Sequence, residues 1–92
     1  MEQAQRAHVV FSGNVQGVGF RFTAEKLASQ NEVTGFVKNL PDGRVEIVCE
    51  ATQDQLESFL YGIEKDMDGY ISDSQVKWEP KSGEFSLFEI RF

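Results

Sequence analysis

The pattern of apolar and polar residues over the first third of the chain predicts a strand followed by a helix. Residues 8–12 (HVVFS) are β-prone and run into Gly13, where the pattern breaks. The segment 21–30 is predicted to be an amphipathic helix that ends at Asn31. Its apolar positions recur at helical spacing, at Phe20, Ala24, Leu27 and Ala28.

A β-hairpin is predicted next. Residues 33–39 (VTGFVKN) form its first strand, and residues 40–43 (LPDG) have the proline, aspartate and glycine of a tight turn. Residues 44–50 form the return strand, and their alternation predicts a single buried face. That face carries Val45, Ile47 and Cys49, whereas Glu46, Val48 and Glu50 lie on the other.

The second half of the chain repeats the order helix then strand. Thr52 and Gln55 have the spacing of a capping box at a helix start. The helix is predicted to stop near residues 68–69, and a turn at residues 81–83 separates two short strands. The apolar stripe of the helix is Leu56, Phe59, Leu60, Ile63 and Met67; the strands carry Val76 and Trp78, then Phe88, Ile90 and Phe92.

The predicted order is therefore β-α-β-β-α-β with a further strand at the C-terminus. This order is typical of a split β-α-β, a ferredoxin-like two-layer sandwich of the α+β class. Its sheet is mostly antiparallel, and right-handed crossovers place the two helices on one face. A chain of 92 residues is long enough for one core, so we expect residues 1–92 to form a single domain.

Composition narrows the range of partners. The formal net charge of −6 provides no general attraction for nucleic acid or for an anionic membrane, so we expect neither as a partner. The single cysteine excludes an internal disulfide, and no Cys/His cluster suggests a metal site. The first residues lack the apolar core of a signal peptide, and no stretch is long enough to cross a bilayer. A cytoplasmic location is the expectation.

A glycine-rich stretch between the first strand and the first helix is the main candidate for chemistry. The sequence GNVQGVGFR, residues 13–21, holds three glycines and places Arg21 at a helix start. It matches neither the Walker loop nor the dinucleotide fingerprint. Free backbone N–H groups and a helix N-terminus can bind a small anion, which would offset the unfavourable charge of Arg21. Spacing alone supports equally a tight corner with a solvated arginine.

Two motifs in the chain resemble those of one family. GNVQGVGFR closely resembles the acylphosphatase signature G-x-V-Q-G-V-x-F-R. Residues 35–46, GFVKNLPDGRVE, match a second element of that family, G-x-V-x-N-x-x-D-G-x-V-E. The family's domain has about ninety residues, so the resemblance covers essentially the whole chain, although the part after residue 52 matches by pattern alone. The chain is identified as a member of the acylphosphatase family on these motifs.

The resemblance implies an activity and a set of site residues. It implies hydrolysis of the mixed anhydride of an acyl phosphate to carboxylate and phosphate, with no metal or organic cofactor. Arg21 and the loop amides would bind the phosphoryl group, and Asn39 would orient the attacking water. Expected partners are a small acyl phosphate and phosphate itself, as product or inhibitor. The phosphate-binding residues would be Val15, Gln16, Gly17, Val18, Gly19, Phe20 and Arg21.

Two other functions compete with a free-standing enzyme. Similar domains begin large hydrogenase-maturation proteins that act with carbamoyl phosphate, so an accessory phosphate-binding domain is one alternative. The short chain and the presence of both Arg21 and Asn39 favour the enzyme. Binding of single-stranded RNA shares the element order, but residues 44–50 hold no aromatic residue and the charge is negative. The patterns leave the oligomeric state open, and we expect a monomer.

Overall fold

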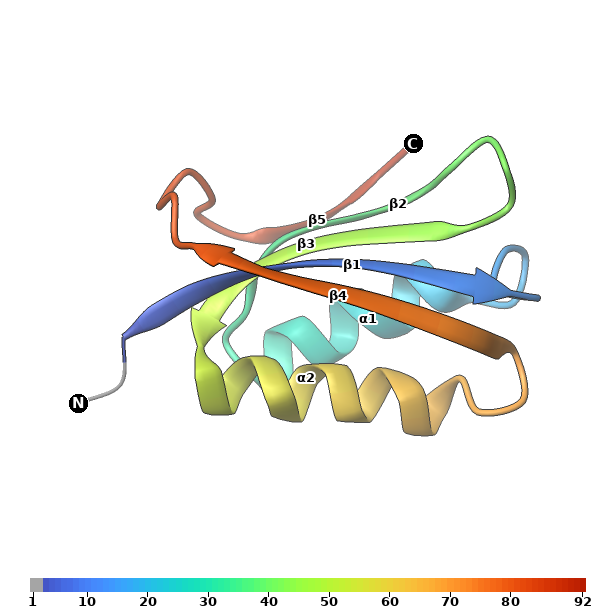
Figure 1. The fold of residues 1–92 in the computed structure, drawn as a ribbon, viewed down its shortest axis with the longest axis horizontal. Helices are drawn as coiled ribbons and strands as arrows, with labels where there is room; N and C mark the ends of the chain where they lie inside the picture. Colours follow the sequence, from blue (N-terminus) through green and yellow to red (C-terminus); the bar gives the residue numbers. More distant parts are fainter. Residues whose placement is uncertain (1–2) are drawn as a thin grey trace.

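The computed structural model describes residues 3–92, which form one five-stranded sheet and two helices (Figure 1). The strands lie in the order β4-β1-β3-β2-β5. All neighbouring pairs are antiparallel except β2 and β5, which are parallel. The elements are β1 (Ala4–Gly13), α1 (Phe20–Gln30), β2 (Thr34–Asn39), β3 (Val45–Thr52), α2 (Gln53–Asp66), β4 (Ile71–Pro80) and β5 (Phe88–Arg91).

Both helices cover the same face of the sheet, as the element order predicts (Figure 1). β3 lies between β1 and β2, and β1 lies between β3 and β4, so each helix connects two strands that are one strand apart. The core is formed where the helices meet this face. It is built from Ala7, Val9, Phe11, Val15, Phe20, Ala24, Leu27, Ala28, Val33, Val37, Val45, Ile47, Cys49, Ala51, Leu56, Phe59, Ile63 and Met67.

The two helices begin in different ways. The N-terminus of α2 has the predicted capping box: the Thr52 hydroxyl accepts a hydrogen bond from the Gln55 amide, and the Gln55 side chain accepts one from the Thr52 amide. The N-cap of α1 is Gly19, which has no side chain to cap the helix, and the first turn has no acidic residue. The start of α1 therefore keeps both its free N–H groups and its partial positive charge.

The prediction that β3 has one buried face is wrong. Val48 and Glu50 lie on the face away from the helices, yet they are only 6% and 4% exposed. The segment 81–87, between β4 and β5, covers this part of the sheet. The Phe85 ring lies 6.1 Å from the Phe36 ring, and the Arg6 guanidinium lies 5.5 Å from the Phe85 ring. Alternation along one strand does not reveal this cover, because it comes from a distant part of the chain.

The strand predicted around Val76 and Trp78 is also longer than expected. β4 runs for ten residues and pairs with β1 over most of that length. It lies at the edge of the sheet, so both Val76 and Trp78 remain 43% exposed. The apolar alternation marked only the part of the strand with large side chains, whereas the polar residues before Val76 are strand as well.

A buried carboxylate fixes the covering segment to the sheet. Glu50 accepts hydrogen bonds from the Ser82 amide at 2.9 Å, the Ser82 hydroxyl at 2.7 Å and the Gly83 amide at 3.0 Å. An Arg6 nitrogen lies 3.4 Å from the same carboxylate and 2.6 Å from Glu84. Burial alone raises the pKa of Glu50, but these hydrogen bonds and Arg6 outweigh it and hold the pKa below its ordinary value.

We expect Glu50→Gln to lower the free energy of unfolding at neutral pH by about 1–3 kcal/mol, because buried hydrogen bonds to a charged acceptor are lost. The folded-state pKa of Glu50 lies below the ordinary 4.5. The ionised carboxylate therefore stabilises the fold above pH 4.5, and this stabilisation is lost as the pH falls through the folded pKa. Urea unfolding of both proteins from neutral to acid pH should show the difference shrinking.

The control for this prediction is Glu25→Gln, which removes the same charge from an exposed position of α1. It should leave the unfolding free energy nearly unchanged throughout. A difference between wild type and Glu50→Gln that stays constant down to acid pH would contradict the role given to the ionised Glu50.

Candidate functional site

The glycine-rich segment connects β1 to α1 and has an irregular backbone. Gly17 and Gly19 have φ values of 77° and 80°, in the left-handed region that glycine adopts without strain. The Asn14 amide donates to the Tyr70 carbonyl at 2.8 Å, which fixes the start of the segment. Within residues 3–92, the N–H groups of residues 15–19 donate to no main-chain carbonyl. The segment thus presents free amide donors next to a helix N-terminus.

Phe20 anchors the start of α1 in the core. Its side chain is 2% exposed, and its ring lies 5.1 Å from the ring of Phe11 on β1. Because Phe20 points inward, the next residue in the helix, Arg21, points toward the edge of the core. The tight packing of Phe20 therefore determines where the arginine can reach.

The C-terminal end of the chain holds the Arg21 side chain. The guanidinium carbon lies 4.7 Å from the centre of the Phe92 ring, and one guanidinium nitrogen is 3.5 Å from the Arg91 carbonyl. Within the described residues, no carboxylate lies at ion-pair distance from Arg21. Arg21 is thus oriented by neutral groups and keeps its positive charge available for an anion.

The turn between β2 and β3 lies at the same end of the sheet as the segment that connects β1 to α1 (Figure 1). Asn39 is the last residue of β2, where Leu40 begins the turn. The Gln16 side chain of the glycine-rich segment donates to the Leu40 carbonyl at 2.8 Å and to the Arg44 carbonyl at 3.0 Å. These two hydrogen bonds tie the segment to the turn, so they determine the position of Asn39 relative to the free amides.

A hollow of about 190 Å³ lies between these parts of the chain. It brings together Arg21 and Asn39, the two residues predicted to be catalytic. Of the residues predicted to bind phosphate, Gln16 and Val18 are not among those lining the hollow, since Gln16 bonds to the turn and Val18 packs against the core. The lining consists of Val15, Gly17, Gly19, Phe20, Arg21, Phe22 and Asn39.

Sequence reasoning missed two features of this hollow. Phe22 lines it and is 72% exposed; its position outside the apolar stripe of the helix was an available signal. The contact of Arg21 with Phe92 depends on the parallel pairing of β5 with β2, which no local pattern indicates. Asp42, by contrast, is a turn residue as expected, because its carboxylate accepts hydrogen bonds from the Arg44 amide and side chain.

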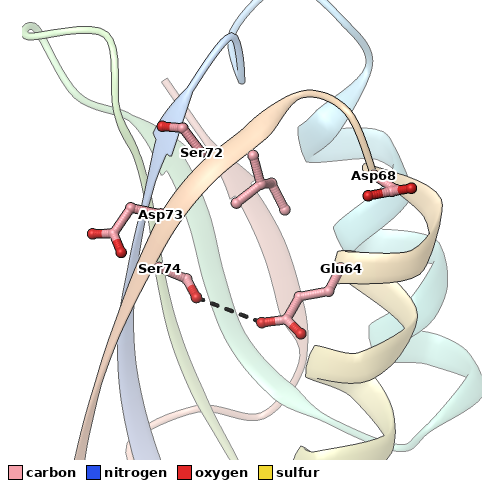
Figure 2. A pocket seen from close by; sticks show the side chains of 6 residues that line it. Glu64, Asp68, Ser72, Asp73 and Ser74 are labelled. Atoms are coloured by element: carbon pink, nitrogen blue, oxygen red, sulfur yellow. Dashed lines mark hydrogen bonds between the residues drawn. The ribbon is translucent and has the colours of Figure 1, made fainter.

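A second hollow, of about 350 Å³, lies between the end of α2 and the start of β4. Figure 2 shows Glu64 and Asp68 on the helix side and Asp73 on the strand, with its side chain pointing away from Glu64. The Ser74 hydroxyl donates to Glu64 at 3.5 Å. The negatively charged carboxylates of this hollow repel a phosphate. Within residues 3–92, no group of His, Cys, Asp and Glu side chains is arranged to hold a metal ion. We therefore take the hollow lined by Arg21 and Asn39 as the candidate functional site.

Two reactive side chains lie outside the functional site. Cys49 is fully buried, its thiol faces the Ala7 carbonyl at 3.6 Å, and burial raises its pKa to about 12. Such a thiol is inert, as expected from its position on the buried face of β3. His8 is half-exposed and lies 2.8 Å from Glu46 on the other face of the sheet. Neither residue is among those lining the hollow.

The fold and the hollow together define a class of site. Free amides, an uncapped helix N-terminus and an arginine with no carboxylate partner among residues 3–92 are features that favour the binding of a small oxyanion. The acylphosphatase family model matches residues 7–90. An acylphosphatase of Methanospirillum hungatei is 41% identical over 88 residues, which cover 95% of this chain and 97% of the relative. The chain belongs to the acylphosphatase family, whose members are hydrolases acting on acyl phosphates.

Solved structures agree with this assignment. The crystal structure of acylphosphatase from Bacillus subtilis is 30% identical, with a TM-score of 0.89 over 96% of this chain and 99% of that one. HypF of T. kodakarensis also matches, at 30% identity and a TM-score of 0.82, but this chain covers only 12% of it. No helix in the described part of the chain is long and apolar enough to cross a membrane.

Proposed function

We propose that Arg21 and the loop amides bind the phosphoryl group of an acyl phosphate, and that Asn39 orients the water that attacks it. The observation that supports this proposal is the lining of one small hollow by Gly17, Gly19, Arg21 and Asn39. The substrate has a charged phosphoryl end and a carbonyl carbon beyond its bridging oxygen. The hollow is proposed to hold the phosphoryl end.

Charge stabilisation carries most of the proposed catalysis. Phosphoryl transfer proceeds through a loose transition state in which negative charge spreads over three equatorial oxygens. The free N–H groups of residues 15–20 and the guanidinium of Arg21 can donate to these oxygens, and the planar guanidinium can hold two of them. Because the Arg21 guanidinium already lies beside the Phe92 ring and the Arg91 carbonyl, little rearrangement is required when the charge develops.

Asn39 has the chemistry of a positioning group. Its side-chain carbonyl can accept a hydrogen bond from water, but an amide is too weak a base to remove the proton. The oxygens of the substrate's own phosphoryl group, or the solvent after bond formation, would accept that proton. The P–O bond to the acyl group breaks as the bond to water oxygen forms, and the electron pair leaves with the carboxylate.

The nature of the leaving group supplies the test of this proposal. A carboxylate is already a stable anion and needs no protein acid, whereas an alkoxide does. The chain should hydrolyse benzoyl phosphate, at an unchanged rate with a chelator present, and should release no measurable phosphate from glycerol phosphate. Comparable hydrolysis of both compounds would require a protonating group that the proposal lacks.

The rate should also be nearly independent of pH over roughly pH 6 to 8, because the proposed mechanism uses no histidine or other group that ordinarily changes its charge in that range. The measurement is kcat/KM for benzoyl phosphate at constant ionic strength. His8→Ala, which alters a residue on the other face of the sheet, should give the same flat profile. A step near the ordinary pKa of histidine that disappears in His8→Ala would count against this mechanism.

We further propose that residues 1–92 act as a single cytoplasmic domain and as a monomer, without a metal or organic cofactor. An accessory phosphate-binding domain is the second candidate, and the similarity to one part of HypF supports it. Phosphate binding without hydrolysis of benzoyl phosphate would favour that second candidate. Light scattering of the purified chain tests whether it is a monomer in solution.

A further inference from the structure

The hollow described above leaves limited room for the acyl part of the substrate. At about 190 Å³ it is smaller than the clefts of roughly 300–1,000 Å³ that enclose drug-sized ligands. With the phosphoryl group at Gly17, Gly19 and Arg21, we take the acyl group to project toward the rim. Attacking and leaving oxygens lie roughly in line in this reaction, so the acyl group also points away from the water at Asn39.

The apolar side chains that line the hollow differ in what they can contact. Val15 is fully buried and Phe20 is 2% exposed, so both are used by the core. Phe22 is 72% exposed, and it directly follows Arg21 in α1. Among residues 3–92, it is the one large apolar side chain that both lines this hollow and has most of its surface free.

We propose that Phe22 contacts the acyl group and gives the chain a preference for acyl phosphates with an aromatic acyl group over those with a small one. This inference rests on the proposed function, because it takes the phosphoryl group to be bound at Arg21. An aromatic ring on the substrate can stack on or lie edge-to-face with Phe22, whereas an acetyl methyl group is too small to cover it. The Phe92 ring, which the Arg21 guanidinium contacts, is not among the residues that line the hollow.

The test compares kcat/KM for benzoyl phosphate and for acetyl phosphate in the wild type and in Phe22→Ala. The ratio of the two values cancels their different intrinsic reactivities when proteins are compared. We expect Phe22→Ala to lower the ratio of benzoyl to acetyl phosphate about tenfold, because kcat/KM for benzoyl phosphate falls. This is the size expected for the loss of one aromatic contact. Hydrolysis of acetyl phosphate should stay within about twofold, because the phosphoryl site is unchanged.

Two further variants serve as controls. Phe22→Tyr keeps the ring and should keep the wild-type ratio. Tyr61→Ala removes an aromatic side chain that is 67% exposed on α2 and does not line the hollow, so it too should keep the ratio. Thermal unfolding of Phe22→Ala should match the wild type, since the side chain is mostly exposed.

An unchanged ratio in Phe22→Ala, with both substrates still hydrolysed, would overturn this inference and leave the proposed function intact. An equal fall for both substrates would overturn it as well, because the ring would then not act on the acyl group. A wild type that hydrolyses neither compound would refute the proposed function and this inference together.

Discussion

Replacing Arg21 with alanine should lower kcat/KM for benzoyl phosphate by about 10³-fold or more, the range seen when an arginine that stabilises a transferring phosphoryl group is removed. The side chain is held at the hollow by Phe92 and by the Arg91 carbonyl, and within residues 3–92 it has no carboxylate partner. No carboxylate among residues 3–92 pairs with this positive charge, so the substitution removes a charge that is free to bind the phosphoryl group.

Two variants give this prediction its controls. Arg21→Lys keeps the charge but loses the planar fork, so its activity should lie between those of wild type and Arg21→Ala. Lys26→Ala removes a positive charge from an exposed position of the same helix and should leave kcat/KM within about twofold. Equal losses in Lys26→Ala and Arg21→Ala would mean that general charge, rather than a bound phosphoryl group, sets the rate.

Replacing Asn39 with alanine should lower kcat by about 10²-fold, the cost of a poorly positioned reactant, while KM changes little. Asn39 lies at the end of β2 and lines the hollow, and the Gln16 side chain ties the adjacent turn to the glycine-rich segment. In the proposed site the phosphoryl contacts come from Arg21 and the loop amides, so substrate should still bind. The measurement is steady-state kinetics with benzoyl phosphate.

Lys38→Ala is the matched control for Asn39→Ala, because Lys38 precedes Asn39 in the same strand and points to the opposite face. It should leave both kcat and KM close to wild type. If Asn39→Ala instead raised KM strongly with kcat preserved, Asn39 would be a binding residue and the water would be positioned by another group.

Much of the fold follows from local patterns, because local interactions produce it. The capping box at Thr52 and Gln55 and the end of α1 at Asn31 lie where the sequence predicts them. The buried second face of β3 and the full length of β4 were missed. Glu50 is buried by Ser82 and Gly83, which are far away in sequence, and no periodicity within β3 carries that information.

The candidate site, like the fold, could be predicted only in part from the sequence. Gly17, Gly19, Arg21 and Asn39 belong to two recognisable motifs, and they line one hollow. The stacking of Phe92 on Arg21 depends on the parallel pairing of β5 with β2. That pairing joins strands that are distant in sequence, so no local pattern predicts it. Phe22 could be seen as an apolar residue outside the helix stripe, but only the folded chain brings it to the rim of the hollow.

The most direct test of the phosphoryl-binding role of Arg21 is an NMR titration with inorganic phosphate of the wild type, Arg21→Ala and Asn39→Ala. We expect saturable shifts of the Gly17 and Gly19 amide signals in the wild type and in Asn39→Ala, and no saturable shifts in Arg21→Ala. That result would separate anion binding from positioning of the water. Phosphate binding of wild-type strength in Arg21→Ala would contradict the assignment of Arg21 and the loop amides as the phosphoryl site.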